Sequence, residues 1–311
     1  MNKLISIVIP AYNEEDVVDE LKKRLQHIMS LCSNYDFEVI IVENGSHDNT
    51  YNKLIAVHNE DNRFKVIQLS RNFGSDGGIL AGLRYSRGAA IIIMCADLQD
   101  PPELIIDFIK KWEEGYDIVY GIIKTREGVS VTRKFNSIVA YKLINVLSNN
   151  QIPENVSEFR LIDKKVLTAF NSLDEKNKYI RGLMAWTGFK QTGVIFERPP
   201  RFAGESKADF VNTVKFALNG IFSFSNFPLY IAAILGFILS IAAGILIIYE
   251  LSLYVEYGRV VPGFTSLIVV MLFLFSMLFL VVGILGVYIA RIYEEVMHRP
   301  DYIVNNKIGF E

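Results

Sequence analysis

The sequence predicts an α/β fold with a mostly parallel sheet, followed by a C-terminal hairpin of two transmembrane helices. Two observations predict this fold class. Up to residue 122, short runs rich in Val and Ile alternate with amphipathic segments, a pattern typical of a parallel sheet covered by helices on both faces. After residue 228, two long runs contain no charged residue. The second feature predicts membrane spans.

The predicted strands and helices follow one another in order. Strands are expected at residues 4–10, 37–42, 64–69, 89–95 and 117–122, with helices at 14–31, from Asp48, from about Ser75 and from Pro101. Prolines suit the first turn of a helix. Residues from about 123 to 200 are less regular and are expected to complete the sheet and to supply a lobe that faces a second substrate.

Composition limits the function classes. The 311 residues are 51% hydrophobic, which is more than one soluble domain needs. The 32 basic and 34 acidic residues are interspersed, with a net charge of −2, which argues against nucleic-acid binding. Cys32 and Cys95 have neither metal-site nor disulfide spacing, and the N-terminal apolar run is too short for a signal peptide. A cytoplasmic globular domain with reduced thiols is therefore expected.

Residues 91–103, IIIMCADLQDPPE, join a buried strand to a cluster of polar side chains. Asp97, Gln99 and Asp100 follow the strand directly. Ligands of open α/β sheets lie beyond the carboxyl ends of the strands, so Asp97 is expected at the functional site. The alternative is a polar strand-to-helix turn in which Asp100 is only a helix N-cap.

The two uncharged runs, residues 229–249 and 264–290, can each cross a hydrocarbon core of about 30 Å. Basic residues flank the hairpin on both sides, which places both of its ends in the cytoplasm. The expected organisation is a domain at 1–206, an amphipathic segment at 207–228, spans at about 229–250 and 264–290, and a cytoplasmic tail at 291–311. Two buried core helices are the alternative to the spans, and the amphipathic segment could lie in the membrane interface or pack on the domain.

Four motifs together resemble the family 2 glycosyltransferases: IVIPAYNEE at 7–15, VENGSHDNT at 42–50, SRNFG at 70–74 and the segment at 91–103. The likeness is greatest to the branch that loads sugars onto polyprenyl phosphates, and it covers nearly the whole chain. It implies the nucleotide-diphospho-sugar transferase (GT-A) fold and an inverting transfer of one sugar from a nucleotide sugar, with a UDP-sugar expected, to undecaprenyl phosphate. It also implies a bacterial cytoplasmic (inner) membrane location.

The resemblance places Asp97 and Gln99 where the family holds a divalent cation, Mg²⁺ or Mn²⁺, and makes Asp97 catalytic. Cys95 stands where the family commonly has a first aspartate. A thiol is a poor ligand for a hard cation. The expected ligands are therefore Asp97, Gln99, donor phosphates and water, with weak metal binding until the donor arrives.

The resemblance also assigns the donor-binding residues. They are Pro10, Tyr12, Glu14, Glu43, Asn44, Ser70, Arg71, Gly74, Ala96, Asp97, Arg201, Ser206 and Lys207. Arg201 and Lys207 are expected to act catalytically by closing on the donor diphosphate. Glu43-Asn44 replaces the family's usual Asp-Asp, and Ser75-Asp76 replaces its usual Lys-Glu. The alternative for the segment at 10–14 is an ordinary strand-to-helix turn in which Glu14 favours the helix start, and the alternative for the glycines at 70–78 is a simple tight turn.

The acceptor would be held by basic residues, which the resemblance places at Lys124, Arg126, Arg133 and Lys134. A polyprenyl phosphate is already anionic, so no strong general base is required. These residues could instead attract anionic lipid. Glu158 and Arg160 match the family's DFRL motif with Glu in place of Asp; Glu158 either fixes the donor sugar, orients an arginine, or only pairs with Arg160.

Two other functions are alternatives to a polyprenyl-phosphate glycosyltransferase. A processive polysaccharide synthase would usually carry a Q-x-x-R-W element and more spans, and neither is present. A catalytically silent membrane protein that binds nucleotide sugar is suggested by Cys95 and Glu43-Asn44. Glycines in the spans could also allow close helix packing in a homo-oligomer.

Overall fold

The computed structural model describes residues 2–124, 156–173, 175–176, 178, 180–199, 202, 227–257 and 263–310. The chain divides into two compact units. The first contains Met1–Val214 together with Arg299–Glu311, and the second contains Lys215–His298.

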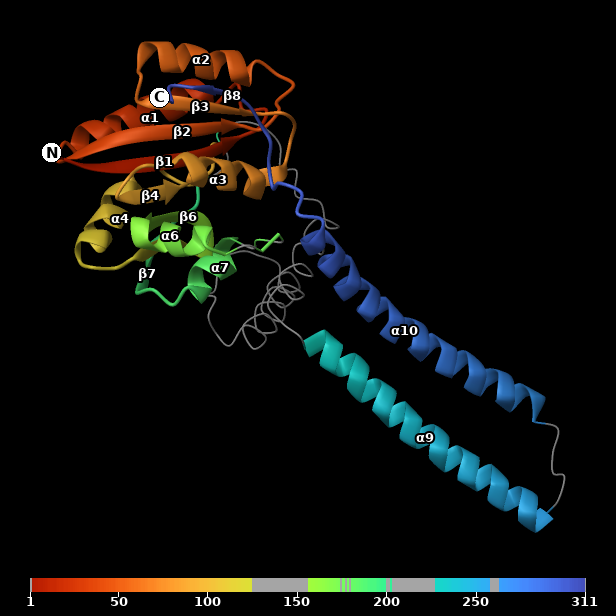
Figure 1. Cartoon of the computed structure of the whole chain (residues 1–311). Helices are drawn as coiled ribbons and strands as arrows, with labels where there is room; N and C mark the ends of the chain where they lie inside the picture. The colour runs from red at the N-terminus through yellow and green to blue at the C-terminus, as the bar shows by residue number, and fades with distance from the viewer. Residues whose placement is uncertain are drawn as a thin grey trace. The chain divides into compact units, whose positions relative to one another are not determined.

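The first unit is built on one eight-stranded sheet of order β7-β5-β6-β4-β1-β2-β3-β8 (Figure 1). The strands are β1 (Lys3–Ala11), β2 (Tyr35–Glu43), β3 (Phe64–Leu69), β4 (Ala90–Ile93), β5 (Ile118–Ile123), β6 (Val156–Asp163), β7 (Gln191–Phe196) and β8 (Val304–Ile308). Strands β4, β1, β2 and β3 are parallel neighbours. Strand β6 runs antiparallel to β4 and β5. The predicted α/β fold with a mostly parallel sheet is confirmed.

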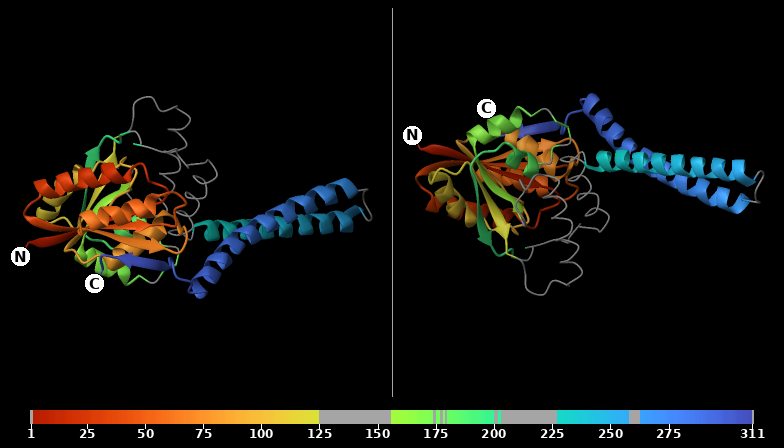
Figure 2. Two further views of the ribbon diagram at one scale, coloured as in Figure 1. Left: turned by 90° about the horizontal axis from the view of Figure 1, so that it is seen from above. Right: turned by 90° about the horizontal axis from the view of Figure 1, so that it is seen from below.

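Helices cover both faces of this sheet (Figure 2). They are α1 (Val18–Leu31), α2 (Thr50–Glu60), α3 (Gly74–Tyr85), α4 (Leu104–Glu113), α6 (Lys164–Asn171) and α7 (Ile180–Trp186). Leu25, Leu54 and Phe108 from α1, α2 and α4 are buried in one cluster with Ile7 and Ile41 of the central strands. The continuous apolar strands predicted this arrangement, because both of their faces are buried.

Helix α3 lies on the opposite face, where Ala81 packs with Ile40 and Ile67. It approaches the sheet closely because it carries glycine at the contact. A Cβ atom added at Gly82 would lie 2.3 Å from Val8 Cγ1. This helix follows the loop at 70–74. The close packing of α3 against the sheet therefore fixes the position of that loop.

The C-terminal residues differ from the sequence expectation. Residues 291–311 were expected to form a tail, but α10 continues to Val296 and β8 then joins the sheet antiparallel to β3. Strand β8 reads VNNKI and lacks the apolar alternation that marks a half-buried strand. Its backbone nevertheless satisfies the exposed hydrogen-bonding edge of β3.

The second unit contains the long helices α9 (Phe227–Tyr257) and α10 (Phe264–Val296). Leu229–Leu246 and Val269–Val296 are long and apolar enough to cross a membrane, and only 6% and 0% of their residues are buried. Large apolar side chains such as Phe237 and Phe279 are exposed. A helix in a soluble core would bury such side chains, so the two helices form a candidate membrane hairpin rather than core helices.

Candidate functional site

The carboxyl ends of the parallel strands meet at one edge of the sheet. Ala11 of β1 lies opposite Glu43 of β2, which in turn lies opposite Gln68 of β3. Ile93, the last residue of β4, lies opposite Val8 of β1. The segments that follow these strands, which carry most of the residues assigned from the motifs, therefore emerge side by side at this edge.

The loops after β1 and β2 are joined by hydrogen bonds. Asn13 has a φ of 54°, and its backbone N–H donates to Ser46 Oγ at 3.0 Å. Its own side-chain oxygen accepts from the His47 N–H at 2.9 Å. The Glu14 N–H donates to Thr50 Oγ1 at 2.9 Å. These bonds hold the segment that contains Tyr12 and Glu14 in one conformation.

Asn44 links the β2 end to the loop before α3. Its side-chain Nδ2 donates to the Gly74 carbonyl at 2.8 Å, and its Oδ1 accepts from the Phe73 N–H at 2.9 Å. Asn44 is only 3% exposed. An aspartate could accept the second bond but could not donate the first, because an ionised carboxylate carries no hydrogen. The departure from Asp-Asp at this position therefore has a structural reason.

The neighbouring Glu43 is buried, and its carboxylate accepts a hydrogen bond from the Ser46 N–H. Gly45 follows with a φ of +71°, and a Cβ atom there would lie 2.6 Å from the carbonyl carbon of Arg71. The backbone of the β2 end and the 70–74 loop thus touch at a position that only glycine fits.

The loop at 70–74 is held from two sides. The Gly74 N–H donates to Asn72 Oδ1 at 2.7 Å, and the Arg71 guanidinium lies 4.0 Å from the centre of the Phe73 ring. The Ser70 N–H donates to the Ile303 carbonyl at 2.9 Å. The last contact comes from the segment before β8, so the C-terminal residues support a loop that was assigned to the donor.

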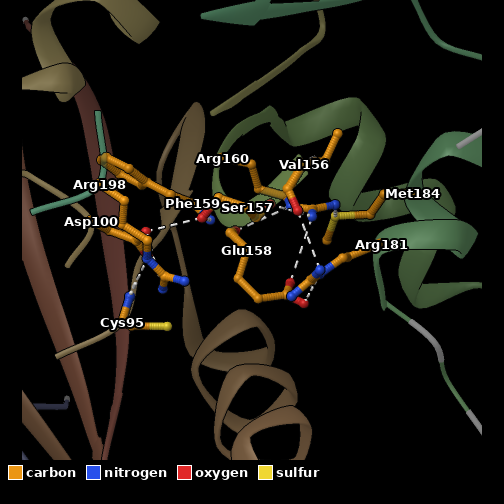
Figure 3. Close-up of polar contacts among 10 residues, drawn as sticks. All are labelled: Cys95, Asp100, Val156, Ser157, Glu158, Phe159, Arg160, Arg181, Met184 and Arg198. Atoms are coloured by element: carbon orange, nitrogen blue, oxygen red, sulfur yellow. Dashed lines mark hydrogen bonds and ion pairs between the residues drawn. The ribbon is translucent and has the colours of Figure 1, made fainter. Parts of the chain in front are cut away.

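The loop after β4 folds around two buried carboxyl groups. Asp97 is 6% exposed and Asp100 is fully buried. Asp97 Oδ1 accepts from the Gln99 N–H at 3.2 Å, across Leu98 with a φ of 56°. Asp100 Oδ1 accepts from Ser157 Oγ at 3.0 Å, and its Oδ2 accepts from the Cys95 N–H at 3.4 Å (Figure 3).

Asp100 has a structural role that differs from the predicted alternative. The N-cap of α4 is Glu103, not Asp100. Burial raises the pKa of Asp100 and the Asp97 charge raises it further, against the opposing effects of Arg198 and the Ser157 hydroxyl. Asp100 thus ties the loop to the start of β6 and leaves Asp97 as the carboxylate nearer the surface.

Cys95 does not fit as a metal ligand. Burial, together with the charges of Asp100 and Asp97, raises the pKa of its thiol well above the usual value. The thiolate is the form that binds metals, so a neutral thiol contributes nothing there. In the described part of the chain, no group of three His, Cys, Asp or Glu side chains is placed to hold a metal. The oxygens of Asp97 and Gln99 suit a hard cation as an incomplete ligand set that a phosphate could complete.

Glu158 lies at the same edge, because β6 begins beyond the end of β4. Arg160 pairs with Ile93, and Glu158 precedes it by two residues. The Glu158 carboxylate forms an ion pair with Arg181 of α7, and its Oε2 lies 3.6 Å from Arg160 Nη2. Arg181 lies in the irregular middle region and belongs to none of the four motifs, so the sequence alone does not point to it.

Asp76, in the first turn of α3, faces this group. Loss of hydration and the Glu158 charge raise its pKa to about 6, although Arg181 and Arg160 act in the opposite direction. Four charged side chains from α3, β6 and α7 are therefore electrostatically coupled at the sheet edge.

The structure brings all of the described candidate residues to this edge. They are Pro10, Tyr12, Glu14, Glu43, Asn44, Ser70, Arg71, Gly74, Ala96, Asp97, Gln99, Lys124, Glu158 and Arg160. Lys124 follows β5 and pairs with Glu197 at 2.8 Å. Arg126, Arg133, Lys134, Arg201, Ser206 and Lys207 lie outside the described residues.

Comparison with known proteins agrees with the motifs. The profile of glycosyl transferase family 2 matches residues 6–170. An uncharacterised glycosyltransferase of Synechocystis is 42% identical over 311 residues, covering 99% of this chain and 96% of the relative. A prophage bactoprenol glucosyl transferase homologue of Escherichia coli is 35% identical, covering 96% of this chain and 98% of the relative.

Solved structures with this fold include a bacterial sugar transferase. Glucosyl-3-phosphoglycerate synthase from Mycobacterium tuberculosis, in complex with Mn²⁺, uridine diphosphate and phosphoglyceric acid, superposes with a TM-score of 0.50 at 16% identity. The likeness covers 71% of this chain and 77% of that chain. The expected GT-A fold is confirmed. The profile match over more than half of the chain, and relatives that align over nearly all of it, show that this glycosyltransferase belongs to glycosyl transferase family 2.

Proposed function

We propose that this glycosyltransferase transfers one sugar, with inversion, from a nucleotide sugar to a polyprenyl phosphate at the bacterial cytoplasmic membrane. One observation carries the proposal: proteins named bactoprenol glucosyl transferase align with nearly the whole chain, including its two apolar helices. An acceptor confined to the bilayer and an enzyme anchored in it meet at a high effective concentration. The hairpin therefore suits a lipid acceptor.

The donor site is assigned to the edge where β1 to β4 end. Asp97 and Gln99 would hold Mg²⁺ or Mn²⁺ together with the donor phosphates, since their oxygens suit a hard cation. When bound, such a cation stabilises the charge that develops on the leaving diphosphate. The M. tuberculosis synthase was solved with Mn²⁺ and uridine diphosphate, and a UDP-sugar is the donor we propose here.

The remaining residues have proposed roles at this site. Tyr12, Glu14, Ser70 and Arg71 would contact the nucleotide, while Glu43 and Asn44 shape the loops around it through the bonds described above. Arg201, Ser206 and Lys207 would close on the diphosphate. Lys124, Arg126, Arg133 and Lys134 would hold the acceptor phosphate, with the domain and both termini in the cytoplasm.

The alternative of a catalytically silent nucleotide-sugar-binding protein rests on Cys95. The neutral thiol at this position removes one acidic group from the metal site. Retention of Asp97 at the strand end favours the enzyme, because the motif keeps one carboxylate, which accepts a hydrogen bond from the Gln99 N–H within the loop.

The test is transfer by the purified full-length chain from a panel of labelled nucleotide sugars to undecaprenyl phosphate, with Mg²⁺ or Mn²⁺. Undecaprenol without phosphate serves as the matched control acceptor. We expect a lipid-linked product from one donor only, and only with the phosphorylated acceptor. Donor binding without turnover of any donor would support the silent protein, and equal use of undecaprenol would contradict the phosphate acceptor.

A further inference from the structure

The Glu158 carboxylate lies between two arginines that make different contacts. Arg160 is 2% exposed, and its guanidinium donates to the Ser157 carbonyl at 3.1 Å and to the Glu158 carbonyl at 3.2 Å. Its Nη1 also lies 3.7 Å from the sulfur of Met184. Arg160 thus braces the backbone at the start of β6.

Arg181 contacts the carboxylate itself. Its Nε donates to Glu158 Oε1, and its Nη1 donates to the Val156 carbonyl at 3.2 Å. Two bonds from one planar guanidinium fix both the backbone and the side chain of the same strand end. Figure 3 shows Arg181 meeting the end of the Glu158 side chain from α7, away from Asp100 and Cys95. The orientation of the Glu158 carboxylate therefore depends on Arg181.

In the part of the chain that the structure describes, the second oxygen of this carboxylate lacks a hydrogen bond that a ligand could supply. Glu158 Oε2 is buried and accepts no hydrogen bond from the described residues; its ion-pair contact with Arg160 is longer, at 3.6 Å. A buried acceptor without a hydrogen bond costs free energy that a hydroxyl donor would recover. Glu158 lies beyond the end of β4, at the sheet edge where the loop at 70–74 follows β3. Its charge also raises the pKa of Asp76, in the first turn of α3.

We propose that Arg181 is a positioning residue for recognition of the transferred sugar: it turns Glu158 so that Oε2 accepts a hydrogen bond from a sugar hydroxyl of the donor. This inference rests on the proposed function, because it assumes that a nucleotide sugar binds at this edge. The nucleotide and diphosphate would bind without this contact. Substitution of Arg181 should therefore weaken binding of the sugar nucleotide and leave binding of the nucleoside diphosphate unchanged.

The test measures binding of the donor selected by the panel, and of its nucleoside diphosphate, to the full-length chain in detergent by calorimetry. Arg181→Met is expected to weaken sugar-nucleotide binding at least about tenfold, the loss typical of one charge-assisted hydrogen bond. The dissociation constant of the nucleoside diphosphate should change less than about twofold, which corresponds to about 0.4 kcal/mol. Arg63→Met is the matched control, because Arg63 also pairs with a carboxylate, that of Asp61, but precedes β3 at the opposite edge.

A double-mutant cycle separates positioning from general structure. Glu158→Gln should show the same sugar-selective loss, and the Arg181→Met/Glu158→Gln variant should lose no more than Glu158→Gln alone. Arg181→Lys should recover part of the affinity. Equal weakening of both ligands by Arg181→Met, or additive losses in the double variant, would overturn the inference.

The outcomes also separate this inference from the proposed function. If no donor is turned over but the sugar-selective loss is found, the proposed transfer fails and the inference stands. If the wild-type chain transfers sugar and Arg181→Met binds the donor normally, only the inference fails. If no nucleotide sugar binds the wild-type chain more tightly than its nucleoside diphosphate, the Glu158 contact does not exist.

Discussion

Two residues at the sheet edge, Asn44 and Cys95, replace aspartates that are usual in the family, and their contacts show that the site can form without those aspartates. Asn44 makes one bond as a donor and one as an acceptor, which the usual aspartate could not do. Cys95 contributes its backbone N–H to Asp100, while its thiol stays neutral. The two substitutions therefore affect the support of the site and the number of acidic groups in it, and they leave Asp97 in place.

A first prediction concerns Asp76. Its pKa in the folded chain is raised from 3.8 to about 6, so the folded state holds the proton more tightly than the unfolded state. Stability is therefore greatest at low pH and is lost as pH rises from about 4 to about 6. Asp76→Asn removes this loss and should unfold at a higher temperature than the wild type at pH 7.5.

The gain should be small, because Asp76 as a whole residue is exposed even though its carboxyl group loses hydration, and solvent therefore screens part of its interactions. Thermal unfolding of both proteins at pH 5.0 and 7.5 checks this expectation, with the difference shrinking at the lower pH. A variant that is less stable than the wild type at pH 7.5 would show that Asp76 is stabilised as a carboxylate.

A second prediction concerns Gly45. Alanine there must adopt a positive φ, at a cost of about 1–2 kcal/mol, and must also push back the Arg71 backbone. Gly45→Ala should lower the free energy of unfolding and raise the donor KM. Gly115→Ala is the control, since Gly115 has a φ of +88° but nothing within 4 Å of an added Cβ. A rise in donor KM in both variants would mean that contact with Arg71 is irrelevant.

Asp97 is predictable from the sequence, because a long apolar strand ends beside it and strand ends in such sheets share an edge. Arg181 is not predictable, because it reaches Glu158 from α7, 23 residues further along the chain. Asn44 is not predictable either, because its two partners lie near the start of α3. Contacts between loops of different strands depend on three-dimensional packing that spacing along the chain does not encode.

At the scale of elements, the four parallel strands were predictable from continuous apolar runs. Strand β8 was not, because its residues are polar and its position follows from the unpaired edge of β3. The antiparallel direction of β6 was also not predictable, since its hydrogen bonds to β4 and β5 join distant parts of the chain.

The packing of α3 against β1 gives a third prediction. Gly82→Ala places a Cβ atom 2.3 Å from Val8 Cγ1, and overpacking of this kind costs about 1–3 kcal/mol. The better helix propensity of alanine recovers only up to about 1 kcal/mol. Chemical denaturation should show a net loss of stability.

The matched variant is Val8→Ala, which makes room for the added methyl group. The double variant should be less destabilised than the sum of the two single variants, because the clash is removed. Strictly additive losses would mean that α3 shifts away from β1 rather than pressing on Val8.

At the scale of the whole molecule, the C-terminal residues return to the sheet after the hairpin. The ends of the hairpin are therefore joined to one unit, and the proposed topology requires both on the same side of the membrane. Residues 258–262, between α9 and α10, would lie on the other side.

This topology gives a fourth prediction. A membrane-impermeant maleimide applied to intact cells should label Glu256→Cys, near the end of α9, and should label Asn305→Cys in β8 only after lysis. The wild-type chain, with Cys32 and Cys95, is the background control. Labelling of Asn305→Cys in intact cells would reverse the proposed orientation.

The most direct test of the account is sugar transfer to undecaprenyl phosphate by wild-type and Asp97→Asn chains, with metal and with a chelator. We expect lipid-linked product from the wild type with Mg²⁺ or Mn²⁺, and a loss of at least about 100-fold with the chelator or with Asp97→Asn, as for removal of one transition-state-stabilising group. Asp107→Asn is the control, because Asp107 is an exposed carboxylate on α4 paired with Lys110. Wild-type rates from Asp97→Asn would contradict the assignment of this sheet edge as the active site.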